Sequence, residues 1–170
     1  MSALRINISK LSEGTHQRSL HATPAEIGLD ERFTREAKIE ATLEKTSRQL
    51  LLHVEFTTGG VFTCDRCLEE FETGVSSTFR VVYVMDSGGA VNNGEEVQVL
   101  SPDANYIDLA EDVRQYAILA LPQKMLCRED CAGLCPSCGT NLNRAACDCR
   151  TDRVDSRWTG LQPFLKDQKN

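Results

Sequence analysis

The sequence contains no apolar run long enough to span a membrane, and no N-terminal apolar core with a basic flank. We therefore expect neither a membrane anchor nor a secretory signal, which favours a cytoplasmic protein. Positive charge is also scarce: 19 Lys and Arg residues stand against 25 Asp and Glu residues, a formal net charge of −6. The deficit is concentrated in residues 60–120, which carry three bases and eleven acids. Such a chain repels phosphate, which excludes binding of RNA by bulk electrostatics and suits a basic partner or simple solubility.

Sequence motifs of common catalytic sites are missing as well. The chain has no H-E-x-x-H zinc motif, no P-loop and no nucleophile elbow. It also shows no internal repeat apart from recurring pairs of cysteines. We therefore expect a protein that is not an enzyme and has no small-molecule substrate.

Cysteine, in contrast, is plentiful. The eight cysteines form four close pairs, which are Cys64 with Cys67, Cys127 with Cys131, Cys135 with Cys138, and Cys147 with Cys149. The strongest unit is the C-P-S-C-G run that ends at Gly139, because glycine permits the positive φ that turns backbone N–H groups toward the sulfurs. Zinc prefers four soft ligands in a tetrahedron, and two close pairs from separate turns supply them.

Two other interpretations of the cysteines compete with zinc. A disulfide framework is disfavoured because no secretory signal is visible and a chain of 170 residues does not need disulfides to fold. A redox C-x-x-C normally opens a helix after a strand, where the helix dipole lowers a thiol pKa. Cys135 and Cys138 lie instead in a turn rich in Gly, Pro, Ser and Asn. Zinc is therefore the preferred interpretation.

The spacing favours two zinc ions per chain. Cys135, Cys138, Cys147 and Cys149 are nearest in sequence and are expected to form one site. Cys64, Cys67, Cys127 and Cys131 then remain for a second site, which would tether the C-terminal arm to the sheet. Two alternatives stay open: a single zinc at the C-terminal cluster, and a different partition in which Cys131 replaces Cys147.

Hydrophobic alternation predicts an α+β fold dominated by an antiparallel sheet. An antiparallel meander is expected over residues 36–85, with further strands at 4–8 and 95–100. Turns or loops are expected at 57–60, at 86–93 and at 14–24, where His16 and His21 are interpreted as solvated loop residues. One helix is predicted from Asp108, with Glu111 completing a capping box, to about Leu121, where Pro122 stops it.

The helix is expected to pack on one face of the sheet through a stripe of Leu109, Val113, Tyr116, Ala117 and Ala120. A C-terminal arm resembling a zinc ribbon is expected to follow it. We divide the chain into a sheet domain at residues 1–126 and a cysteine-rich arm with a C-terminal helix at 127–170. In that arm Trp158, Leu161 and Leu165 share one helical face, which indicates core packing more than stacking on a base.

These pieces together resemble the YceD family, the large ribosomal RNA subunit accumulation proteins. The resemblance is carried by Cys64-Asp65-Arg66-Cys67-Leu68, by the C-A-G-L-C-P-S-C-G-T-N-L-N run that begins at Cys131, and by Asp155-Ser156-Arg157-Trp158. It covers the chain from about residue 36 onward. It implies a cytoplasmic bacterial protein, or a chloroplast one, that supports accumulation of large-subunit ribosomal RNA.

The function expected from all this is that of a non-enzymatic zinc-binding factor in ribosome biogenesis. Its partners would be ribosomal RNA or ribosomal proteins of the large-subunit precursor. Arg144, Arg150, Arg153 and Arg157 flank the second cysteine cluster, and they either contact phosphate or offset the negative zinc-thiolate site. The alternatives are a zinc-stabilised protein-interaction module without RNA contact, a thiol redox enzyme, and a DNA-binding zinc ribbon, which the acidic charge disfavours.

Overall fold

The structure is a computed structural model that describes residues 4–84, 96–101, 103–149 and 157. A five-stranded sheet in the order β2-β3-β4-β5-β6 dominates it, beside a two-stranded sheet of β1 and β7. The strands are β1 (Arg5–Asn7), β2 (Gly14–Ala22), β3 (Phe33–Lys45), β4 (Gln49–Thr63), β5 (Glu70–Val84), β6 (Glu96–Val99) and β7 (Tyr106–Asp108). The helix α1 spans Ala110–Leu119. It is too short and not apolar enough to cross a membrane, and no other α-helix occurs in the described residues.

Strands β3, β4 and β5 form the predicted antiparallel meander. Their side chains alternate between the two faces of the sheet, so one face collects the apolar residues. In β3 these include Ile39 and Leu43, and their partners across the ladder are Phe56 and Leu52 of β4. All four are almost completely buried, and each such side chain contributes about 1.5–3 kcal/mol relative to an exposed one.

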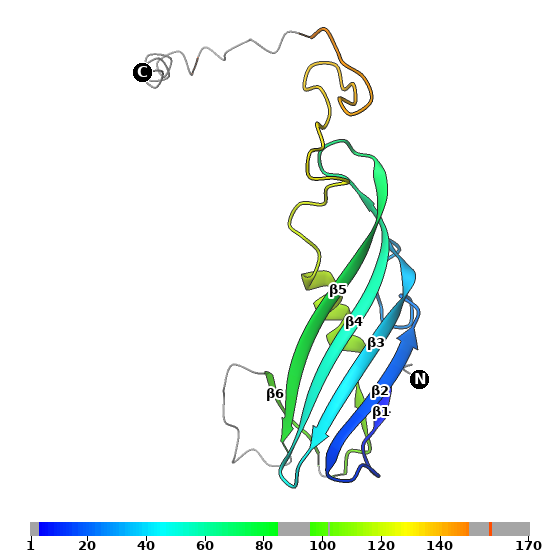
Figure 1. The fold of residues 1–170 in the computed structure, drawn as a ribbon, viewed down its shortest axis with the longest axis vertical. Helices are drawn as coiled ribbons and strands as arrows, with labels where there is room; N and C mark the ends of the chain where they lie inside the picture. The colour runs from blue at the N-terminus through cyan, green and yellow to red at the C-terminus, as the bar shows by residue number, and fades with distance from the viewer. Residues whose placement is uncertain (1–3, 85–95, 102, 150–156, 158–170) are drawn as a thin grey trace.

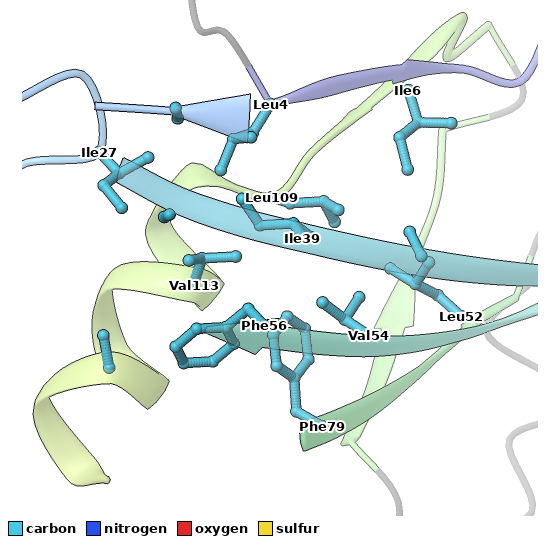
Figure 2. Close-up of a cluster of buried hydrophobic side chains, with 14 of the residues drawn as sticks. Leu4, Ile6, Ile27, Ile39, Leu52, Val54, Phe56, Phe79, Leu109 and Val113 are labelled. Atoms are coloured by element: carbon cyan, nitrogen blue, oxygen red, sulfur yellow. The ribbon is translucent and has the colours of Figure 1, made fainter. Parts of the chain in front are cut away.

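The second layer covers this apolar face with α1, β1 and β7. Figure 2 shows Leu109 and Val113 on one side of the core and Val54 and Phe56 of the sheet on the other. Tyr116 of the helix also stacks on Phe79 of β5, with ring centroids 4.5 Å apart. The predicted α+β class and the predicted packing of the helix on one face of the sheet are therefore confirmed.

Two segments predicted as loops are strand. A polar loop is predicted at residues 14–24, but residues 14–22 form β2, which pairs with β3 over its whole length, and only residues 23–24 lie outside it. Most residues of β2 are exposed, so its sequence lacks the apolar alternation that identifies a strand. Residues 57–60, predicted as a turn, lie inside β4. Gly60 is needed there for close approach, because a Cβ atom would lie 1.9 Å from the carbonyl oxygen of Arg32.

The predicted capping box at the start of α1 is wrong. The N-cap residue is Leu109, and no side chain caps it. Asp108 belongs to β7, where it forms an ion pair with Arg5 of β1 at 3.1 Å, although its Oδ1 still accepts a bond from the N–H of Ala110. The carboxylate of Glu111 accepts hydrogen bonds from Arg114 and Gln115, and not from the backbone N–H of Asp108 as a capping box would require. The strand predicted at 95–100 exists as β6, but it pairs parallel to β5, so the sheet is mixed.

The cysteine-rich arm lies beyond the end of the sheet at which β4 passes into β5 (Figure 1). The chain leaves α1 after Leu119, two residues before the predicted end, runs along the connection between β4 and β5, and continues to residue 149. The predicted loop at 86–93 and the predicted helical face of Trp158 lie outside the described residues. The domain boundary after residue 126 stays a prediction.

Candidate metal centres

Four cysteines from two distant parts of the chain form the first cluster, here called the bridging tetrad. Cys64 and Cys67 come from the connection between β4 and β5, and Cys127 and Cys131 follow the helix. The Sγ atoms of Cys64 and Cys131 are 3.8 Å apart, and those of Cys67 and Cys127 are 3.7 Å apart. All four Sγ atoms lie within 4.8 Å of one another, and three of the four residues are buried.

The second cluster, here called the local tetrad, is built from one short stretch. It contains Cys135, Cys138, Cys147 and Cys149, whose Sγ atoms also lie within 4.8 Å of one another. Cys135 is buried, Cys147 and Cys149 are half-buried, and Cys138 is exposed. The eight cysteines thus divide as the spacing favoured, and the partition with Cys131 in place of Cys147 does not occur.

The sulfur geometry of the bridging tetrad fits a tetrahedral metal site, and the four Sγ atoms of the local tetrad lie within the same 4.8 Å of one another. Zinc–thiolate bonds of about 2.3 Å give a tetrahedron whose sulfur–sulfur edges are about 3.8 Å. The two separations of 3.7 and 3.8 Å in the bridging tetrad match that edge. A disulfide would bring two sulfurs to about 2.05 Å, and all eight cysteines are free thiols. The donor set of four thiolates is the one that zinc prefers in structural sites.

Both tetrads are built on the same backbone turn. In the first turn, the N–H of Leu68 donates to the carbonyl of Cys64, and the N–H of Cys64 donates to the carbonyl of Glu69. In the second, the N–H of Gly139 donates to Cys135, and the N–H of Cys135 donates to Thr140. We call these turns the first and second knuckle, comprising residues 64–69 and 135–140. Each requires a left-handed residue after its second cysteine, with φ of 58° at Leu68 and 75° at Gly139.

The two residues between Cys64 and Cys67 hold the arm against the sheet. Asp65 contacts Met125 twice, since its N–H donates to the Met125 carbonyl and its Oδ2 accepts from the Met125 N–H at 2.7 Å. Arg66 donates from Nη1 to the carbonyl of Cys131 at 2.9 Å and toward that of Glu129. The first pair of cysteines is therefore linked by hydrogen bonds to residues both before and after Cys127.

Contacts from the local tetrad's loop reach back to the bridging tetrad. The Nδ2 of Asn143 donates to the Sγ of Cys131 at 3.3 Å, while its Oδ1 accepts from the N–H of Ala132. Gly133 has φ of 73°, and a Cβ there would lie 3.0 Å from the carbonyl oxygen of Arg66. Arg144 pairs with Glu69 at 2.6 Å. Two tetrads that are separate in sequence are therefore one packed unit.

Within each tetrad the thiols differ in their affinity for protons. Burial acts to raise the pKa of Cys64, but backbone N–H groups, first that of Cys127, outweigh it and lower the pKa to about 6. Burial raises the pKa of Cys127 to about 12. In the local tetrad, the hydroxyl of Thr140 lowers the pKa of Cys138 to about 6, and the contact with Cys138 raises the pKa of Cys149 to about 12. A dication must therefore displace protons from each tetrad, so its binding weakens as pH falls.

Comparison with known proteins identifies the family. The protein family described as "Large ribosomal RNA subunit accumulation protein YceD" matches residues 52–165 of the chain, and this range includes all eight cysteines. The chain belongs to the YceD family. The match begins within β4, so it covers both knuckles and α1 but not β2 or β3.

Relatives of this YceD family member occur in bacteria and a plant. An uncharacterised protein of Mycobacterium tuberculosis is 28% identical over 152 residues, covering 86% of this chain and 73% of that protein. One from Mycobacterium leprae is 28% identical over 127 residues, 75% of this chain and 58% of that protein. The chloroplastic YCED homolog 1 of Arabidopsis thaliana, named a large ribosomal RNA subunit accumulation protein, is 32% identical over 60 residues, 35% of this chain and 19% of that protein. No solved structure matches the chain.

Sequence reasoning found the cysteines of this YceD family member but missed the residues that support them. Asn143 and Gly133 were part of the quoted family motif, yet no role was assigned to either. The contact of Asn143 with Cys131 is not visible in a spacing pattern, because it depends on how two loops fold together. The left-handed position at Gly133 was a readable signal, since glycine is the residue that such a position favours. Of the four arginines proposed near the second cluster, Arg150 and Arg153 lie outside the described residues.

Proposed function

We propose that the chain is a non-enzymatic zinc-binding factor that supports accumulation of large-subunit ribosomal RNA. Membership of the YceD family and the name of the Arabidopsis relative support the link to that RNA. The observation that carries the zinc assignment is the pair of tetrads, each with four thiols at separations that suit one tetrahedral ion. Each tetrad would hold one Zn²⁺, and zinc would supply structural cross-links there.

The proposal that the chain is not an enzyme follows from the ligand sets. Catalytic zinc sites keep an open position for water or substrate, usually with histidine or carboxylate among three protein ligands. Four thiolates close the coordination sphere, and three of those in the bridging tetrad are buried. A redox enzyme would instead present thiols that alkylating reagents modify in the native protein. We expect the zinc-loaded chain to resist alkylation until a chelator is added.

A second candidate, a protein-interaction module without direct RNA contact, is favoured by the pairing of the arginines. Arg66 donates to carbonyls of the arm, Arg128 binds Asn143 and Asp130, and Arg144 binds Glu69. These guanidinium groups, one in the first knuckle and two in the described part of the arm, are all engaged within the chain. Contact with ribosomal proteins would still support accumulation of ribosomal RNA. This candidate therefore differs in the partner, a protein in place of RNA, and not in the process that the chain supports.

A deletion experiment tests the proposed function. Cells that lack the gene should show a reduced ratio of large-subunit to small-subunit ribosomal RNA, restored by the unaltered chain. A Cys64→Ser, Cys67→Ser double variant should restore it poorly, whereas an Arg18→Ala variant on the exposed edge strand β2 should restore it fully. An unchanged RNA ratio after deletion contradicts the proposal.

A further inference from the structure

The residue that follows the second cysteine of each knuckle differs between the two knuckles. The turns have the same backbone hydrogen bonds and the same left-handed residue, which is glycine at position 139 and leucine at position 68. Glycine adopts this conformation without a steric cost, whereas a residue with a Cβ atom does not. Among the described residues, Leu68 is the one non-glycine residue with positive φ.

Packing within the chain does not account for this leucine. Leu68 is 63% exposed, in contrast to Cys64 and Cys67 beside it, which are buried. A leucine that packed into the core would repay the backbone strain by burying apolar surface, but this one is directed to solvent. The turn requires the left-handed conformation but not a leucine in it, and strained residues of this kind are found at functional sites more often than elsewhere.

The surroundings of Leu68 are acidic. Residues 64–72 contain four acids and one base, Arg66, which is bound to carbonyls of the arm. Glu69 and Glu72 form ion pairs with Arg144 and Arg35, so the acidic character beside Leu68 comes from Asp65 and Glu70. Asp65 and Glu70 are exposed on either side of the leucine in sequence. Four thiolates and one Zn²⁺ in the bridging tetrad, whose ligand Cys67 directly precedes Leu68, would add a formal charge of −2.

We propose that Leu68 is an apolar anchor by which the first knuckle docks into a hydrophobic pocket, rimmed by Lys and Arg, on a basic protein. Charge complementarity favours a basic partner, because acidic groups around the anchor would steer and orient it. RNA is the poorer fit, since phosphate is repelled and leucine has no aromatic face on which a base could stack. The inference rests on the proposed function, and it narrows the partner to a basic protein of the large subunit.

Leu68→Gly provides a test that separates docking from folding. Glycine removes the side chain and gives position 68 the residue that the equivalent position 139 already has. The variant should keep its zinc and melt at the same temperature as the parent or higher. Leu68→Met keeps an apolar anchor, and Leu119→Ala removes another exposed leucine, 75% exposed at the end of α1. Both serve as controls.

The binding probe is the protein fraction of purified large ribosomal subunits, with the protein-free RNA of the same subunits as the second arm. The full-length zinc-loaded chain should retain a basic protein, and Leu68→Gly should bind that purified protein about 10- to 100-fold more weakly, the loss of one buried leucine. Both controls should bind like the parent. The inference is overturned if Leu68→Gly binds equally well, if the parent retains no protein from the fraction, or if the variant loses affinity only for RNA.

The inference and the proposed function fail in different ways. An unchanged ratio of ribosomal RNAs after gene deletion removes the proposed function itself. A normal ratio in cells that carry Leu68→Gly, together with undiminished protein binding, removes the anchor and leaves the zinc factor in place.

Discussion

The two tetrads share ligands and turn geometry but differ in what they join. The bridging tetrad joins Cys67 to Cys127, 60 positions apart in sequence, and Cys64 to Cys131, 67 positions apart. Three of its four cysteines are buried. The local tetrad closes a single loop between Cys135 and Cys149, and Cys138 is exposed. A metal in the first site would therefore hold the arm to the sheet, whereas a metal in the second would shape the arm alone.

The difference follows from the position of each knuckle in the fold. The first knuckle is the connection between two long strands of a rigid sheet, so its cysteines start from a fixed place. The second knuckle has one isolated bridge, between Leu134 and Asn141, and depends on the first for support. Contacts from Asn143, Gly133 and Arg144 supply that support.

The largest difference between the tetrads is expected for loss of a cysteine. Cys64→Ser should lower the zinc content by one and reduce the free energy that holds the arm by about 4 kcal/mol, the effect of opening a cross-link over some 60 residues. Cys138→Ser should also lower the zinc content by one, but thermal unfolding of the sheet should change little. Elemental analysis and melting curves measure the two effects, with Cys67→Ser as a second variant of the same tetrad. Equal destabilisation of the sheet by Cys64→Ser and Cys138→Ser contradicts the comparison.

Removal of the hydrogen bond to Cys131 should have the next largest effect. Asn143→Ala is expected to weaken zinc binding at the bridging tetrad about 10- to 100-fold, because outer groups that bind a ligand tune its affinity. The matched change is Thr140→Val, which removes the hydroxyl 3.2 Å from the Sγ of Cys138 in the local tetrad. Competition with a chromophoric chelator resolves two zinc affinities. Each variant should lower a different one, and a common effect on both affinities counts against two separate sites.

A smaller difference in stability is expected between alanine substitutions at the two glycines with positive φ in the arm, Gly133 and Gly139. Gly133→Ala is expected to cost about 1–2 kcal/mol, since alanine is strained at φ of 73° and its Cβ meets the carbonyl of Arg66. Gly139→Ala has a similar φ of 75° but no atom within 4 Å of the added Cβ. Its effect should be confined to the arm. Limited proteolysis compares the two, and an arm of Gly139→Ala that detaches as readily as that of Gly133→Ala would show that the contact with Arg66 is unimportant.

The smallest effect is expected at the ion pair between the two knuckles. Arg144→Ala should change the stability of the arm by less than about 1 kcal/mol, because Arg144 is 74% exposed and solvent screens such pairs. Chemical denaturation measures this directly. RNA binding should also be unaffected, and a clear loss of RNA binding with unchanged stability would support phosphate contact by Arg144.

Local patterns predicted the parts of this molecule that depend on neighbours in sequence. Alternation gave the meander of β3, β4 and β5, and the close pairs gave the division of the cysteines. The edge strand β2 was missed because few of its residues are buried. The capping box failed because pairing with Arg5, a residue 103 positions away, placed Asp108 in β7.

Long-range contacts also explain why the residues that support the metal centres could not be predicted from the sequence. Asn143 and Gly133 act on the bridging tetrad through the fold of the arm, which no spacing specifies. The unusual backbone conformation at position 68, in contrast, could be predicted from the sequence. Aligning the two knuckles by their cysteines sets Leu68 against Gly139, and that comparison alone indicates a left-handed leucine.

Zinc content together with X-ray absorption at the zinc edge tests the central claim most directly. Protein purified without a chelator should contain two zinc ions per chain, each surrounded by four sulfurs at about 2.3 Å. Cys64→Ser should leave one zinc, still bound by four sulfurs in the local tetrad. One zinc in the parent that Cys64→Ser does not change, or nitrogen and oxygen ligands in place of sulfur, would contradict the account of two tetrathiolate sites.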